Sequence, residues 1–111
     1  MAKTRSIPPA TQWSLQARLE RHAATEWKGR CRSVVVRFRG AFAYVDALRD
    51  EDDATPLHLC RLGYLGNPNR WEFAFYAYSS EKYEPSLTLS GEFTATPEEA
   101  FDTAAFTYLQ G

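Results

Sequence analysis

One stretch of the sequence decides the fold: RSVVVRFRGAFAYVDAL, residues 32–48. No other part of the chain is so dense in β-branched and aromatic residues, which fit a pleated, half-buried surface. Gly40 stands in the middle of the stretch and can adopt the positive φ that tight hairpin turns require. We therefore predict two antiparallel strands joined at Gly40.

The length of the hairpin loop decides which side chains share a face of the sheet. The first strand presents Val34, Val36 and Phe38 on one face and Val35, Arg37 and Arg39 on the other. A two-residue loop would pair Phe38 with Ala41, whereas a three-residue loop would pair Phe38 with Phe42. We favour the three-residue loop because it stacks the large side chains together.

Composition indicates one globular domain. The chain has 111 residues, of which 44% are hydrophobic and 14% aromatic, and a chain of this size can bury roughly two thirds of its unfolded surface. No stretch approaches the length of a transmembrane helix, and the first ten residues contain no apolar run. We expect a cytoplasmic protein that does not bind membranes, with Cys31 and Cys60 as reduced, buried thiols.

Two helices are predicted, one near each end of the chain. Residues 1–10 contain adjacent prolines and are expected to form a flexible arm, which leaves residues 11–111 as the single domain. A first helix is predicted from Thr11 to Lys28, because Thr11 can cap it and a glycine follows. A second helix should begin at the capping box Thr96-Pro-Glu-Glu99 and end at Gly111.

The segment between these helices contains further strands. We predict strands at Leu57–Leu65 and Trp71–Tyr78, joined by a turn at Gly66–Asn69, and a loop at Ser79–Ser86. Alternation places Trp71, Phe73 and Phe75 on the core face of the last strand, and Glu72, Tyr76 and Tyr78 on the other. Leu87–Leu89 is a candidate short edge strand. The predicted fold class is α+β, a four-stranded or five-stranded antiparallel meander with an N-terminal and a C-terminal amphipathic helix.

Charge is distributed unevenly along the chain. Residues 1–40 contain nine Lys and Arg against two Glu, a net charge of +7, whereas residues 41–111 contain four basic and twelve acidic residues, a net charge of −8. One interpretation is a basic surface for a nucleic acid or an acidic protein. The other, which we favour, is that the two halves fold against each other and their charges intermix.

Motifs of catalysis and of metal binding are missing from the sequence. His58 and Cys60 are two apart on a predicted strand and should share a face, but at about 7 Å they are too far apart for a thiol and its base. Neither the cysteines and histidines nor the acidic run 49–53 has the spacing of a zinc or calcium site. The chain has no glycine-rich phosphate loop and no nucleophile elbow. We predict a protein without catalytic residues, metal or cofactor.

The candidate binding surface combines arginine and tyrosine. Arg37 and Arg39 share one face of the hairpin, and Tyr76 and Tyr78 share one face of a later strand. If these faces coincide, they form a platform of aromatic rings and guanidinium groups. Our first prediction is a small non-enzymatic interaction module that binds a protein partner or itself through exposed aromatics or an open sheet edge. The alternative is a nucleic-acid-binding accessory protein that uses this platform and the basic first third of the chain.

Several segments together resemble a group of small bacterial proteins without an assigned activity. They are Arg37–Val45, Cys60–Tyr64, Arg70–Tyr76, Tyr83–Ser86, Leu89–Gly91 and Thr96–Ala105. The resemblance covers nearly the whole chain from about residue 13. It implies a self-contained bacterial cytosolic domain and brings no catalytic residue with it.

Overall fold

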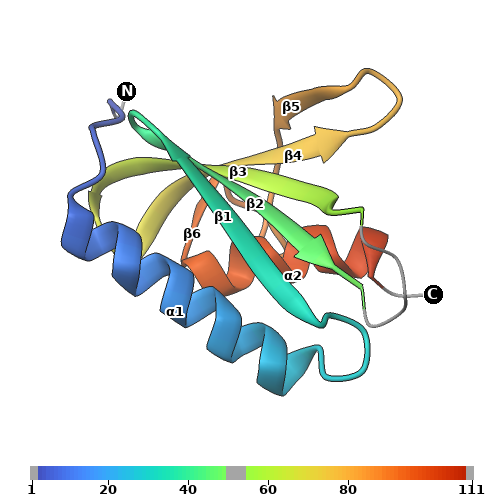
Figure 1. Cartoon of the computed structure of the whole chain (residues 1–111). Coiled ribbons are helices and arrows are strands. Elements are labelled where there is room, and N and C mark those ends of the chain that lie inside the picture. Colours follow the sequence, from blue (N-terminus) through green and yellow to red (C-terminus); the bar gives the residue numbers. More distant parts are fainter. Residues whose placement is uncertain (1–2, 50–54, 110–111) are drawn as a thin grey trace.

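The protein is a single antiparallel sheet with two helices on one of its faces (Figure 1). The computed structural model describes residues 3–49 and 55–109. In chain order the elements are α1 (Pro9–Glu26), β1 (Ser33–Arg39), β2 (Phe42–Leu48), β3 (Leu57–Asn67), β4 (Arg70–Ala77), β5 (Lys82–Pro85), β6 (Thr94–Ala95) and α2 (Pro97–Tyr108). The strand order is β1-β2-β3-β4-β5, and β6 also pairs with β4. The predicted α+β fold, a meander between two helices, is confirmed.

The fifth strand is not the one predicted. It is β5, within the segment 79–86 that we expected to be a loop, whereas Leu87–Leu89 forms no strand. β5 lies at the edge of the sheet and is mostly exposed, so it lacks the apolar alternation that identifies a strand in sequence. Residues 50–53 of the acidic run 49–53, and Gly111, lie outside the described residues.

The hairpin turn consists of Gly40 and Ala41. Arg39 pairs with Phe42, and Phe38 therefore pairs with Ala43. Gly40 has a φ of 61° at the first turn position, as a type II′ turn requires, and this turn matches the twist of the flanking strands. The predicted three-residue loop is wrong, because the backbone geometry of the turn outweighs the stacking of large side chains.

This register places the small side chains of β2 under the helices. Ala43, Val45 and Ala47 are fully buried on the helix-covered face. Phe42, Tyr44 and Asp46 point to the opposite face, together with Arg37 and Arg39 of β1. The small residues leave room for α1 and α2, and the aromatic and charged ones stand on the uncovered side.

The segment before α1 is attached to the sheet. The Arg5 amide donates to the Tyr64 carbonyl at 2.9 Å, the Ile7 amide donates to the Gly40 carbonyl at 3.3 Å, and Ile7 is buried. Gly63 makes room for this segment, since a Cβ atom on it would lie 2.9 Å from Thr4 Cγ2. The predicted arm is therefore wrong for residues 5–7. The helix also begins two residues earlier than predicted, at Pro9, a position that suits proline.

The core face of β4 agrees with the predicted alternation. Trp71 and Phe73 are buried, and Phe75 is half-buried and stacks on Tyr108 of α2 with ring centroids 5.2 Å apart. From α1, Leu15 and Leu19 fill the space between the helix and the sheet. Among the described residues, no helix is both long and apolar enough to cross a membrane.

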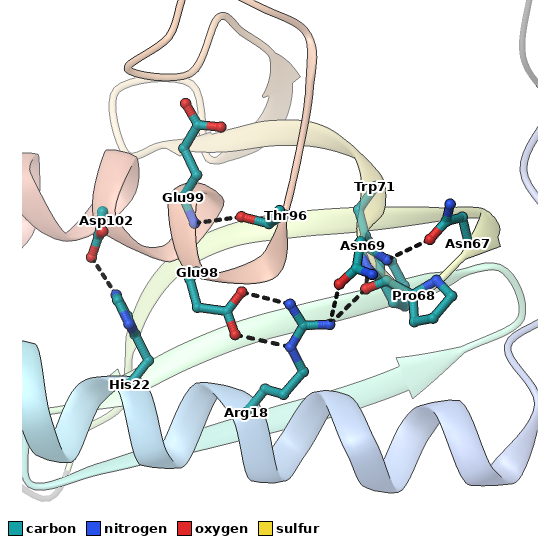
Figure 2. Close-up of polar contacts among 10 residues, drawn as sticks. All are labelled: Arg18, His22, Asn67, Pro68, Asn69, Trp71, Thr96, Glu98, Glu99 and Asp102. Carbon is teal, nitrogen blue, oxygen red and sulfur yellow. Dashed lines mark hydrogen bonds and ion pairs between the residues drawn. The ribbon is translucent and has the colours of Figure 1, made fainter.

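A polar network joins α1 to α2 and to the turn between β3 and β4 (Figure 2). Arg18 donates two hydrogen bonds to the Glu98 carboxylate, at 2.7 and 2.9 Å, and one to Asn69 Oδ1 at 2.9 Å. Asp102 accepts from His22 Nε2 at 2.7 Å and from Trp27 Nε1 at 2.9 Å. These pairs join the basic first third of the chain to its acidic remainder, so charge intermixing holds for these residues.

The Arg18–Glu98 pair predicts a defined pH dependence of stability. Burial raises the pKa of Glu98, but the hydrogen bonds and charge of Arg18 outweigh it, so the pKa lies below its ordinary value of 4.5. A carboxylate with a depressed pKa stabilises the fold above its unfolded-state pKa, and this contribution is lost as the pH falls through the folded-state pKa. Between about pH 5 and pH 3, the wild type should lose about 0.5–1 kcal/mol more stability than Glu98→Gln.

Urea denaturation across this pH range measures the difference. The control is Glu26→Gln on the exposed surface of α1, which should retain the wild-type pH dependence. Equal pH profiles for wild type and Glu98→Gln would contradict the prediction.

At the start of α2, only one of the two hydrogen bonds of the predicted capping box forms. Thr96 Oγ1 accepts from the Glu99 amide at 3.2 Å, as expected. The Glu99 carboxylate instead accepts from the Ser90 amide at 2.9 Å and from the Thr88 hydroxyl at 3.2 Å. Glu99 therefore anchors the segment after β5 onto α2.

Candidate functional site

The sheet face opposite the helices carries a connected cluster of aromatic and charged side chains. No helix among residues 3–49 and 55–109 covers this face (Figure 1). We call the cluster the tyrosine platform; its members are Arg37, Tyr44, Asp46, His58, Tyr76, Tyr78 and Tyr83. They come from β1, β2, β3, β4 with its following turn, and β5.

Tyr76 lies at the centre of the tyrosine platform. Its ring centroid is 4.7 Å from that of Tyr78, 4.8 Å from that of Tyr83 and 4.9 Å from that of His58. The ring of Tyr44 continues the cluster, 5.2 Å from Tyr83. The Tyr76 pairs with Tyr78 and Tyr83 are edge-to-face, the arrangement that aromatic quadrupoles favour. The rings therefore hold one another in fixed orientations.

Asp46 is the polar centre of the platform. It is 3% exposed, and its carboxylate accepts from Arg37 Nε at 3.2 Å and pairs with His58 Nδ1 at 2.8 Å. The Arg37 guanidinium also lies 5.4 Å from the centre of the Tyr44 ring, in cation–π geometry. Buried carboxylates are stable only when paired and hydrogen-bonded. Asp46 thus fixes the positions of both Arg37 and His58.

The hydroxyl groups of Tyr78 and Tyr83 stay protonated at neutral pH. Burial, reinforced by the charge of Asp46, raises the pKa of Tyr83 to about 12. Burial also raises the pKa of Tyr78, whose hydroxyl accepts from the His58 amide at 2.7 Å. For Arg37, burial lowers the pKa, but hydrogen bonding to Asp46 and its charge outweigh burial, so the net pKa is raised. The platform therefore offers neutral hydroxyl donors beside a permanent cation.

The predicted surface residues fall on one face, but only three of them join the cluster. Arg37, Tyr76 and Tyr78 belong to the platform. Arg39 points to the same face by alternation and is exposed, and among the described residues it makes no hydrogen bond, ion pair or ring contact with the cluster. The binding role of these four residues stays a prediction.

Sequence reasoning missed four members of the platform: Tyr44, Asp46, His58 and Tyr83. Asp46 was the available signal, because a single acid within an apolar strand needs a partner on its own face. Tyr44 follows from the observed hairpin register, which pairs Phe38 with Ala43 and is neither of the two pairings considered from sequence. Tyr83 lies in a segment predicted to be a loop.

His58 and Cys60 do not share a face. Asp46 pairs with His58 and Val45 pairs with Cys60, so an extra residue, Leu59, forms a β-bulge in β3. Because Val45 and Asp46 point to opposite faces of β2, His58 lies on the platform and Cys60 in the core. The predicted common face is wrong, because a bulge is set by pairing with another strand.

Cys60 is chemically protected. It is fully buried, and burial, with a further contribution from the charge of Asp46, raises its pKa well above its ordinary value. In a Cys31→Ser variant, which leaves Cys60 as the only thiol, a disulfide reagent at neutral pH should react at least ~100-fold slower with native than with urea-unfolded protein. Equal rates in native and unfolded protein would contradict the protection of Cys60. They would make a Cys60-dependent enzymatic activity a candidate function again.

The other cysteine and histidine also have structural surroundings. Cys31 is buried, and His22 belongs to the network between the helices. Within the described part of the chain, no group of three or more His, Cys, Asp and Glu residues could hold a metal ion.

Comparisons with known proteins give no further guidance. No family model, no curated protein and no solved structure matches the chain. The residues of the open sheet face are therefore the basis for a functional inference.

Proposed function

We propose that the protein is a small, non-enzymatic cytoplasmic binding module that recognises a protein partner through the tyrosine platform. The observation that supports this is a cluster of four tyrosines, one histidine and one arginine on a sheet face that no helix among the described residues covers. Tyrosine and arginine are the residue types most enriched, with tryptophan, among interface hot spots. They combine a large contact area with hydrogen-bond donors.

The platform is also preorganised for binding. Asp46 holds Arg37 and His58, and the tyrosine rings are packed against one another. Binding to side chains that are already fixed costs little conformational entropy. Its tyrosine hydroxyls and its guanidinium are donors, so the matching partner surface is apolar with carbonyl or carboxylate acceptors.

Charge on this face favours a protein over a nucleic acid. By alternation the face carries Arg37, Arg39 and Arg61, but also Asp46 and Glu72. The basic residues of α1 lie on the other side of the sheet, where Arg18 pairs with Glu98. The basic residues of α1 therefore add no charge to the platform face, and a mixed-charge aromatic surface is typical of protein interfaces.

Partner capture from the native cell, followed by reconstitution with the purified partner, tests the proposal. Tyr76→Ala and Arg37→Glu should each weaken the dissociation constant by about 30-fold or more, as expected for hot-spot residues. Trp13→Ala is the matched control, because Trp13 is exposed on α1, away from the platform. Thermal melts establish that each variant is folded, and unchanged affinity in both platform variants would refute the proposal.

Self-association is a separate outcome of the same experiment. Sedimentation equilibrium of the purified protein gives its mass in solution. A dimer that Tyr76→Ala dissociates would make a second copy of this chain the partner, whereas a dimer that survives the substitution would use another surface.

Binding of single-stranded nucleic acid is a second candidate function. It is favoured by one observation, the presence of Arg37 beside tyrosine rings on an open sheet, where bases can stack. Fluorescence anisotropy with single-stranded RNA and DNA tests it in a salt titration that starts at about 50 mM. Affinity that falls steeply with salt would support it, and no binding at the lowest salt would exclude it.

A further inference from the structure

A pocket of about 380 Å³ opens on the same sheet face, beside the tyrosine platform. The residues that shape it are Phe42, Arg61, Gly63, Glu72, Ala74 and Phe93. Ala74, which carries only a methyl group, and Gly63 form the floor, and the Thr4 side chain packs against Gly63. Phe42 and Phe93 form apolar walls, and Phe93 is 58% exposed although it borders an apolar pocket.

The path of the chain along β4 creates this pocket. β5 ends its pairing at Ala74, opposite Pro85, and β6 resumes pairing at Glu72, opposite Thr94. Between these points the Phe73 amide donates to the Phe93 carbonyl at 2.9 Å, and the Phe73 carbonyl accepts from the Ser86 amide at 3.4 Å. Residues 87–92 leave the sheet and are anchored on α2 through Glu99. Pro85 and Phe93 therefore border the pocket from two separate segments along β4.

Two opposite charges flank the floor without pairing. Arg61 lies opposite Ala74 and Glu72 opposite Gly63, so Arg61 and Glu72 are diagonal neighbours whose Cα atoms lie about 7–8 Å apart. Within the described part of the chain, neither side chain makes an ion pair or a hydrogen bond. The Arg61 guanidinium lies over the Phe42 ring, 4.5 Å from the ring centroid, in cation–π geometry.

We propose that this pocket binds a small zwitterion with a large apolar group, such as a free aromatic amino acid. The ligand carboxylate pairs with Arg61, its ammonium pairs with Glu72, and its apolar group packs against Phe93 and Ala74. Diagonal neighbours on one sheet face are within reach of each other's long side chains, so a ligand between Arg61 and Glu72 would make a charged hydrogen bond of about 3 Å to each of them. A neutral apolar ligand would cover both protein charges without pairing them, which is costly.

This inference is independent of the proposed function. The volume lies within the roughly 300–1,000 Å³ range of small-molecule sites, which combine apolar walls with a few placed polar groups. The ligand would sit next to the platform without using its residues. Tyr76→Ala should therefore leave ligand binding unchanged, so the two proposals can fail separately.

Four probes with the same benzyl group test the charge requirement. They are L-phenylalanine with both charges, N-acetyl-L-phenylalanine with the carboxylate alone, L-phenylalaninamide with the ammonium alone, and N-acetyl-L-phenylalaninamide with neither. Titration of the isotope-labelled full chain, followed by NMR, should shift the amides of Gly63, Ala74 and Phe93. L-Phenylalanine should bind roughly tenfold more tightly than each singly charged probe.

Two variants assign each charge to its partner. Arg61→Gln should abolish the preference for L-phenylalanine over L-phenylalaninamide and keep its preference over N-acetyl-L-phenylalanine. Glu72→Gln should abolish the preference for L-phenylalanine over N-acetyl-L-phenylalanine and keep its preference over L-phenylalaninamide. Equal affinity for all four probes, or no shift at the pocket amides up to about 10 mM of any probe, would overturn the proposal.

Discussion

Trp71→Ala should lower the free energy of unfolding by about 3–5 kcal/mol, the cost of removing a large aromatic side chain from a packed core. Trp71 is 1% exposed, and its ring centroid lies 4.9 Å from that of Tyr64. Its Nε1 also donates to the Pro68 carbonyl at 2.9 Å, which fixes the turn between β3 and β4. The same Pro68 carbonyl also accepts from Arg18, so the substitution affects both the sheet and its connection to α1.

The chain contains a matched control for this substitution. Trp13 is 81% exposed on α1, so Trp13→Ala removes the same atoms from the surface and should cost less than about 0.5 kcal/mol. Urea denaturation of both variants, followed by circular dichroism, measures the difference. Similar losses for the two variants would mean that Trp71 does not occupy the core position described above.

Asp46→Ala should cost about 2 kcal/mol, because it removes hydrogen bonds to two groups that carry or can carry charge. Arg37 and His58 would lose the acceptor that positions them. The cost stays below that of a core truncation, because the Arg37 side chain is half-exposed and can turn to solvent. The same substitution should weaken partner binding, since it releases two members of the platform.

A double-mutant cycle separates the interaction energy of Arg37 with Asp46 from the contribution of each side chain alone. Arg37→Ala combined with Asp46→Ala should cost less than the sum of the two single variants, because each single variant already breaks the shared interaction. Glu26→Ala, on the exposed surface of α1, is the control for loss of an acid and should be nearly neutral. A cost for Asp46→Ala as small as that control, or an additive cycle, would contradict the role given to Asp46.

Local signals predicted most of the elements. Gly40 marked the hairpin, Thr96 marked the start of α2, and the alternation from Trp71 onward gave the buried face of β4. Each of these depends on residues close in sequence: a positive φ, a side-chain cap or a period of two. The predicted fold class followed from these elements and needed no long-range information.

The features that sequence did not predict depend on contacts between distant segments. The bulge at Leu59 exists only in the pairing of β3 with β2, and β5 is recognisable only by its pairing with β4. Ile7 is buried because the hairpin turn lies above it. For the same reason, the sequence predicted the platform only if the face with Arg37 and Arg39 coincided with the face of Tyr76 and Tyr78. The pocket depends on residues 87–92 leaving the sheet, and it was not predicted.

The contact between Thr4 and Gly63 has a practical consequence for experiments with immobilised protein. Gly63 is part of the pocket floor, and Thr4 packs directly over it. An affinity tag or fusion partner joined to the amino end would extend from a segment that already contacts the open sheet face at Gly63. We expect it to hinder ligands sterically there, which would be measured as a loss of affinity. Surface attachment should therefore use the carboxyl end, or an engineered site on the solvent side of α1.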